Sequence, residues 1–138
     1  MKGPVFIKTD GSARGESHPN GVSTGIGYVI ENNGTTVSTG NETITNVTES
    51  SSVAEYIALE RALEKVLDLG HSGFIFIKTD SNNLVNLIKG NSSPRTDETA
   101  TWISRIKSQL NYFEGYSISK TNRSFTEDAH NLANKAHR

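Results

Sequence analysis

The chain has 138 residues, of which 33% are hydrophobic and 21% are charged, and its formal net charge at pH 7 is −1. This composition is typical of a folded, soluble protein, and it argues against a disordered chain and against a large basic arm for nucleic acid. The sequence has no cysteine, which excludes disulfides and thiolate zinc sites, and it has no run of about 20 apolar residues that could cross a membrane. We therefore expect a single domain over residues 1–138, cytoplasmic and monomeric, with no obligate protein partner.

The N-terminal third predicts an antiparallel meander. Three strands are expected: residues 4–9, residues 25–30 and, after a hairpin turn into residues 35–40, a third strand to which the alternating residues 41–47 belong. The first strand runs into the turn signal Asp10-Gly11-Ser12, and residues 13–24 are loop-like. Asn32-Asn33-Gly34 is a strong hairpin turn between the later strands.

The remainder predicts helices that alternate with two strands. Apolar residues recur at helical spacing over residues 53–69, around residues 84–88, over residues 98–110, and at Ala129, Leu132, Ala133 and Ala136. Gly70 and Gly90 end the first two of these helices, and residues 91–97 form a polar loop. The wholly apolar run 74–77 is typical of a strand in parallel pairing, and residues 116–119 could add a short last strand. The order predicts an α/β fold.

Two acidic residues follow a repeated apolar motif. Ile7-Lys8-Thr9-Asp10 recurs as Ile77-Lys78-Thr79-Asp80, so each strand delivers an aspartate at its carboxyl end. Ligands bind at this edge of open α/β sheets, and Glu55, in the first turn of the helix over residues 53–69, could point to the same crevice. Three carboxylates that converge there suit Mg²⁺ or Mn²⁺ much better than zinc.

Each acidic residue also has a purely structural interpretation. Asp10-Gly11 could be an ordinary turn. Glu55 follows Ser52 at the spacing of a capping box, and Asp80 could cap the helix that follows it. The functional interpretation is favoured because all three residues lie at the ends of adjacent core elements.

Four segments match a known family in order and spacing: Thr9-Asp10-Gly11-Ser12, Gly25-Ile26-Gly27-Tyr28-Val29, Ala54-Glu55-Tyr56-Ile57-Ala58-Leu59 and Thr79-Asp80-Ser81. Together they resemble type 1 ribonuclease H, in the compact form found in archaea and many bacteria, over nearly the whole chain. The resemblance implies a ribonuclease H-like mixed five-stranded sheet, with an antiparallel meander plus parallel strands, flanked by helices.

The resemblance also implies an activity, namely two-metal hydrolysis of the RNA strand of RNA/DNA hybrids that gives 5′-phosphate and 3′-hydroxyl ends. Asp10 would bridge two Mg²⁺ or Mn²⁺ ions, and Glu55 and Asp80 would help to hold the ion at the leaving oxygen, while the other ion activates a water. Backbone and short polar side chains would read the 2′-hydroxyls of RNA. The candidates for this contact are Gly11, Ser12, Ser51 and Ser52, and the last two stand where the family often has asparagines.

The C-terminal segment departs from the family pattern. Where the family usually has a fourth carboxylate, the register set by the alanine and leucine residues places His130, and Thr126 stands at the place of an asparagine. Asp128 would lie roughly 200° around the helix from His130, so only one of them can face the crevice. We favour His130 as the fourth site residue, either as a metal ligand or as a base near the attacking water. The alternative is a surface histidine beside an incomplete site.

Two other functions stay open at the level of sequence, and a third is disfavoured. The first is a ribonuclease H-like nucleic-acid-binding module whose catalysis is weak or lost because His130 replaces the fourth carboxylate. The second is another nuclease on the same fold, such as a junction resolvase or an enzyme that cuts RNA/RNA duplexes. A binder of small molecules would need a phosphate loop or a dinucleotide fingerprint, and the sequence contains neither.

Overall fold

The computed structural model describes residues 2–14, 23–45, 51–122, 127–129 and 131. The strands in this part are β1 (Val5–Arg14), β2 (Ser23–Asn32), β3 (Thr35–Thr45), β4 (Phe74–Thr79) and β5 (Gly115–Lys120). The helices are α1 (Ser51–Asp68), α2 (Asn82–Lys89) and α3 (Asp97–Leu110). This order confirms the expected α/β arrangement.

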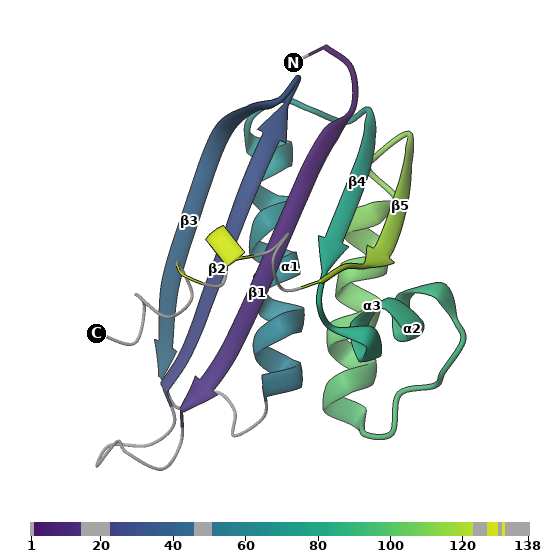
Figure 1. Ribbon diagram of the computed structural model, residues 1–138. Helices are drawn as coiled ribbons and strands as arrows, with labels where there is room; N and C mark the ends of the chain where they lie inside the picture. Colours follow the sequence, from purple (N-terminus) through teal and green to yellow (C-terminus); the bar gives the residue numbers. More distant parts are fainter. Residues whose placement is uncertain (1, 15–22, 46–50, 123–126, 130, 132–138) are drawn as a thin grey trace.

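The five strands form one mixed sheet in the order β3-β2-β1-β4-β5 (Figure 1). β1, β2 and β3 pair antiparallel, whereas β4 pairs parallel with β1 and with β5. Between β2 and β3, Asn33 has φ 55° and Gly34 has φ 76°, which is the pair of positive values that a two-residue hairpin turn favours. The meander and the hairpin were both predicted correctly.

The helices α1 and α3 lie on one face of the sheet, and the short helical segment 127–129 lies on the other (Figure 1). The helix α1 packs against β1 and β2 and is flanked by α3. The expected C-terminal helix is described only at residues 127–129 and 131, and Leu132, Ala133 and Ala136 of its apolar stripe lie outside the described residues.

The core lies between the sheet and α1. Alternate residues of β1 and β4 point into it, and residues 53–60 of α1 are buried without exception. The fully buried large side chains include Ile7, Ile26, Ile30, Ile57, Leu59, Leu63, Ile75 and Ile77. Because α1 is buried over its first turns, its N-terminal half is held firmly against β1.

The structure corrects several expected boundaries. β1 does not end in a turn at Asp10-Gly11, but continues to Arg14, and β2 begins at Ser23. The reason is antiparallel pairing, in which Asp10 faces Gly27 and Gly11 faces Ile26, so tertiary pairing overrides the local turn signal. Residues 35–45 form one continuous strand, which ends two residues before the expected end at residue 47. The helix α1 begins at Ser51, so Glu55 lies beyond its first turn.

Gly11 is required by close packing rather than by a turn. A Cβ atom at this position would overlap the carbonyl carbon and oxygen of Ala54 and would lie 2.8 Å from the amide nitrogen of Glu55. The atoms it would meet belong to the backbone of a buried helix, which cannot move aside cheaply. Gly11 therefore sets how closely α1 approaches β1.

We expect Gly11→Ala to lower the free energy of unfolding by about 1–3 kcal/mol, because α1 must shift to admit the extra methyl group. Urea unfolding followed by circular dichroism measures this change. Ser117→Ala, at an exposed position on β5, is the control and should change stability by no more than about 0.5 kcal/mol. Equal stabilities for Gly11→Ala and the wild type would contradict the packing role of Gly11.

Candidate metal centre

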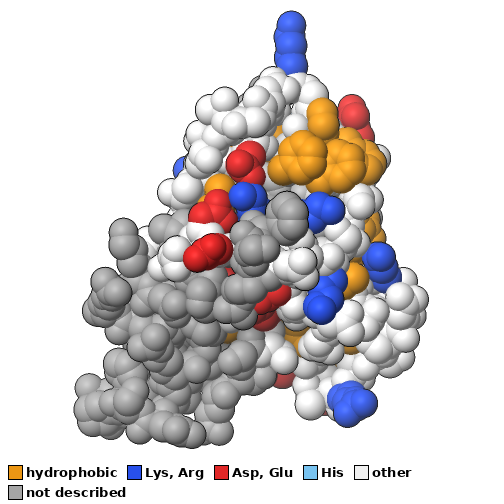
Figure 2. All heavy atoms as spheres, in the orientation of Figure 1, with side chains coloured by type: hydrophobic (Ala, Val, Ile, Leu, Met, Phe, Trp, Pro, Cys, Tyr) orange, Lys and Arg blue, Asp and Glu red, His pale blue; other side chains and the backbone are white. Residues whose placement is uncertain are grey.

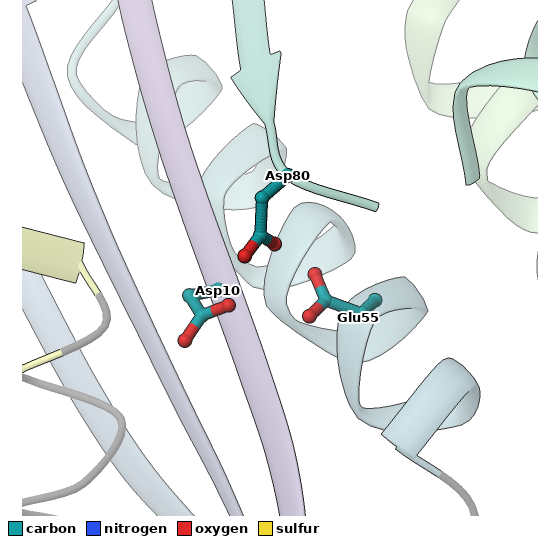
Figure 3. A group of neighbouring side chains, drawn as sticks. All are labelled: Asp10, Glu55 and Asp80. Carbon is teal, nitrogen blue, oxygen red and sulfur yellow. The ribbon is translucent and has the colours of Figure 1, made fainter. Parts of the chain in front are cut away.

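Three carboxylates from three different elements meet at one point of the fold. Asp10 lies on β1, Glu55 on α1, and Asp80 directly after β4 (Figure 3). One oxygen atom from each of the three lies within 4.8 Å of the others. Asp10 and Glu55 are buried, whereas Asp80 is partly exposed. The structure thus brings together the three acidic residues that the sequence singled out.

The pairing of β1 with β4 places the two aspartates side by side. The pentapeptide Phe-Ile-Lys-Thr-Asp occurs at residues 6–10 and again at residues 76–80. The two copies run parallel and in register, with Thr9 beside Thr79. Asp10 and Asp80 are the next residues on each chain, and β4 ends there while β1 continues. This end of β4 opens the space in which the carboxylates meet.

Glu55 reaches the same space because α1 packs so closely against Gly11. The amide of Gly11 donates a hydrogen bond of 3.3 Å to Glu55 Oε1. The other oxygen, Oε2, is buried and has no hydrogen-bond donor among the described residues. A buried carboxylate oxygen without a donor is costly unless a cation binds it. The donor set therefore fits a hard divalent cation such as Mg²⁺ or Mn²⁺.

Two structural interpretations of these acids are wrong. Ser81, not Asp80, caps α2, and its side chain accepts the amide hydrogen of Leu84. Ser52 lies inside α1 rather than before it, so Ser52 and Glu55 do not form a capping box at the start of the helix. Neither carboxylate is therefore used as a helix cap.

Burial and the two neighbouring aspartates raise the cost of ionising Glu55. The pKa of Glu55 lies well above its usual value, mainly because the side chain is buried and secondarily because Asp10 and Asp80 carry like charge nearby. The hydrogen bond from Gly11 opposes this shift only in part. Without a cation, Glu55 therefore holds a proton more tightly than a free glutamate does.

The other predicted site residues fall into two groups. Gly11 contacts the site, and Ser52 lines an open cavity beside α1 together with Tyr56, Asn83 and Arg95. The side chains of Ser12 and Ser51, and the whole of His130 and Thr126, lie outside the described residues. The role of His130 thus stays a prediction.

Asp128 forms an ion pair with Lys8 and is not part of the acidic cluster. Its side chain is half exposed and lies 3.1 Å from the ammonium of Lys8, which also pairs with Glu31 at 3.1 Å. Among the described residues, the acidic cluster contains only Asp10, Glu55 and Asp80. Lys8, which holds this segment, was not among the predicted residues, although the repeated Lys-Thr-Asp motif places it two residues before Asp10 on the same face of β1.

The chain is similar to proteins of known kind over nearly its whole length. Residues 9–136 match the protein family described as reverse transcriptase-like. The structure is similar to RNase H1 from the halophilic archaeon Halobacterium salinarum, with 29% sequence identity, a TM-score of 0.86 and 98% of each chain covered. It is also similar to LC11-RNase H1, isolated from compost by a metagenomic approach, with 27% identity, a TM-score of 0.83, and 96% and 94% of the two chains covered.

LC11-RNase H1 has also been solved in complex with an RNA/DNA hybrid. That structure aligns with 28% identity and a TM-score of 0.76, and it covers 96% of this chain and 95% of the other.

No curated protein sequence matches the chain. In the described part of the chain, none of the helices has the length and hydropathy needed to cross a membrane. The expected resemblance to type 1 ribonuclease H, and the fold it implies, are confirmed.

We expect Glu55→Gln to stabilise the metal-free protein at neutral pH. Because the pKa of Glu55 is raised in the folded state, the folded protein binds this proton more tightly than the unfolded chain does. Stability is thus retained below the unfolded pKa and is lost as the pH rises from there through the folded pKa. Glutamine keeps the oxygen that accepts from Gly11 but carries no charge.

Urea unfolding in EDTA between about pH 4 and pH 8 measures this effect. The advantage of Glu55→Gln should be greatest at neutral pH and should vanish toward the acid end. Glu64→Gln, at an exposed carboxylate on the same helix, is the matched control and should not show this trend. An advantage of Glu55→Gln that is constant with pH would contradict the origin we assign to it.

Proposed function

Because the chain belongs to the reverse transcriptase-like family and has the ribonuclease H fold, we propose that it is an endonuclease that hydrolyses the RNA strand of RNA/DNA hybrids. The observation that carries this proposal is the meeting of Asp10, Glu55 and Asp80 within 4.8 Å, where β1, α1 and the end of β4 converge. The RNA/DNA hybrid bound by LC11-RNase H1 supports the choice of substrate. All three acids come from one chain, which favours a domain that acts as a monomer.

The three carboxylates would hold two divalent ions, Mg²⁺ or Mn²⁺, with Asp10 shared between them. Bound there, the ions would supply the Lewis acidity for attack of water on the phosphodiester, which leaves a 5′-phosphate and a 3′-hydroxyl. The chain's own contribution is to hold the ligands in place. The Gly11 amide fixes one oxygen of Glu55 and leaves the other for a cation.

Short polar groups beside the carboxylates would distinguish RNA from DNA. We assign this role to Gly11, Ser12, Ser51 and Ser52, whose backbone and hydroxyl groups can bond to 2′-hydroxyls in a wide minor groove. Ser52 lies three residues before Glu55 in α1 and lines the cavity that also contains Arg95. The serine hydroxyl has a short reach, so we expect modest affinity for the hybrid.

His130 would complete the site in place of a fourth carboxylate. A neutral imidazole could bind the ion that activates water, or it could accept a proton from that water. Exchange of a carboxylate for imidazole removes one negative charge from the pocket. Affinity for Mg²⁺ should therefore fall, and preference should shift toward Mn²⁺, for which imidazole is the better matched ligand.

We expect the protein to cleave a labelled RNA/DNA hybrid in Mg²⁺ or Mn²⁺, and to leave single-stranded RNA, RNA duplex and DNA duplex uncut. A gel assay separates these outcomes. Asp10→Asn should reduce the rate by about three orders of magnitude or more, because a shared metal ligand is lost. Cleavage that survives Asp10→Asn would refute the metal mechanism, and hybrid binding without cleavage in either metal would identify a non-catalytic module.

We expect His130→Asp to increase cleavage in Mg²⁺ and to lower the Mg²⁺ concentration needed for half-maximal rate, because it restores a hard anionic ligand. Titrations of both metals on wild type and variant measure this shift. Asn131→Asp adds the same charge at the next, exposed position and should leave the metal response unchanged. An identical response of the two variants would show that His130 has no place at the metal ions.

A further inference from the structure

The face of the sheet that is not covered by α1 and α3 carries three matched rows of side chains. Because the repeated pentapeptides run in register, Phe6 lies beside Phe76, Lys8 beside Lys78, and then Asp10 beside Asp80. Side chains two residues apart on a strand share a face and are separated by about 6.6 Å. An aromatic row, a lysine row and the carboxylate row thus follow one another along β1 and β4.

The aromatic row is a stack of rings open to solvent. Phe6 and Phe76 stack with ring centroids 4.9 Å apart and an interplanar angle of 13°. Phe74 adds a third ring, 4.9 Å from Phe76 and tilted by 56°. Phe6 and Phe74 are each 39% exposed. Figure 2 shows this hydrophobic patch as a continuous orange area over the upper ends of the central strands.

In the lysine row, one of the two ammonium groups has no carboxylate partner among the described residues. The ammonium of Lys8 is held by Glu31 and Asp128. That of Lys78 donates a 2.8 Å hydrogen bond to the hydroxyl of Ser119, and no ion pair of Lys78 occurs in the described part of the chain. Lys78 lies between the rings and Asp80 along β4, so its charge faces any chain that runs from the rings to the carboxylates.

We propose that this face binds unpaired nucleotides that extend from the hybrid next to the cleaved segment. Bases would stack on the phenylalanine rings, and a phosphate would lie at Lys78. Proteins that bind single strands combine aromatic platforms with cations in this way, and sheets present such rings to two or three bases. The inference rests on the proposed function, since it extends the same site.

A protein partner fits this face less well. A stable protein interface buries about 800 Å² on each side, far more than three partly exposed rings supply. The rings are also continuous with the carboxylates through strands β1 and β4, which a nucleic acid strand can follow. Single-stranded nucleic acid is therefore the occupant that the charges and the register favour.

Fluorescence anisotropy on the Asp10→Asn chain, in the absence of divalent metal, tests the proposal without cleavage. The probes are a blunt RNA/DNA hybrid and the same hybrid with an unpaired extension of about six nucleotides at either end of either strand. We expect an extension to tighten binding about fivefold or more. Phe74→Leu and Phe76→Leu should each remove most of this gain without weakening binding of the blunt hybrid, and Lys78→Gln should reduce the gain.

Tyr112→Leu is the matched control, because Tyr112 is an aromatic residue that is 70% exposed but lies outside the sheet; it should keep the full gain. No gain from any extension, or a gain that survives both phenylalanine substitutions, would overturn the proposal. Sedimentation that shows a dimer lost on Phe74→Leu would assign the face to a second copy instead. Failure of the wild type to cleave the blunt hybrid would count against the proposed function alone, because the binding comparison needs no cleavage.

Discussion

The parallel, in-register pairing of β1 with β4 is the constraint on which the rest of the site depends. These strands are 70 residues apart in sequence and carry the same pentapeptide, so pairing in register duplicates each side chain across the sheet. Inward-facing isoleucines of both strands lie in the core, and a slip of either strand by one residue would turn the isoleucines of that strand toward solvent. The burial of Ile7 and Ile77 therefore fixes the register, and the register places Asp10 beside Asp80.

The third carboxylate, Glu55, is placed by helix packing rather than by strand pairing, and its burial carries an energetic cost. α1 can bring Glu55 to the aspartates only because Gly11 has no side chain, and the burial that holds the helix there also opposes ionisation of Glu55. The apolar contacts of the same helix, including those of Ile57 and Leu63, offset that penalty. The fold thus stabilises a cluster that is unfavourable by itself until a cation binds, as is common for functional sites.

The sequence was sufficient to predict the element order, the meander and the proximity of the three acids, because each rests on a local pattern or a repeat. The sequence did not predict features that depend on contacts between residues far apart in the chain. Asp10-Gly11 has the local signal of a turn, yet pairing with β2 carries the strand through it. Asp80 and Ser81 can both cap a helix, and only the structure shows that Ser81 does. Lys8 and Asp128 are 120 residues apart, and no periodicity relates them. His130 lies outside the described residues, so its prediction stays untested.

The two copies of the pentapeptide are identical in sequence but not in surroundings. On β1, the lysine is neutralised by Glu31 and by the C-terminal segment through Asp128. On β4, the equivalent Lys78 contacts the hydroxyl of Ser119 and forms no ion pair with any residue that the structure describes, so its positive charge is not neutralised by them. With a net charge of −1, the chain has little long-range attraction for a phosphate backbone. A local cation next to the carboxylates therefore makes a larger relative contribution to that attraction. On the binding mode that we propose, the asymmetry between the two lysines would direct an anionic strand toward β4 rather than β1.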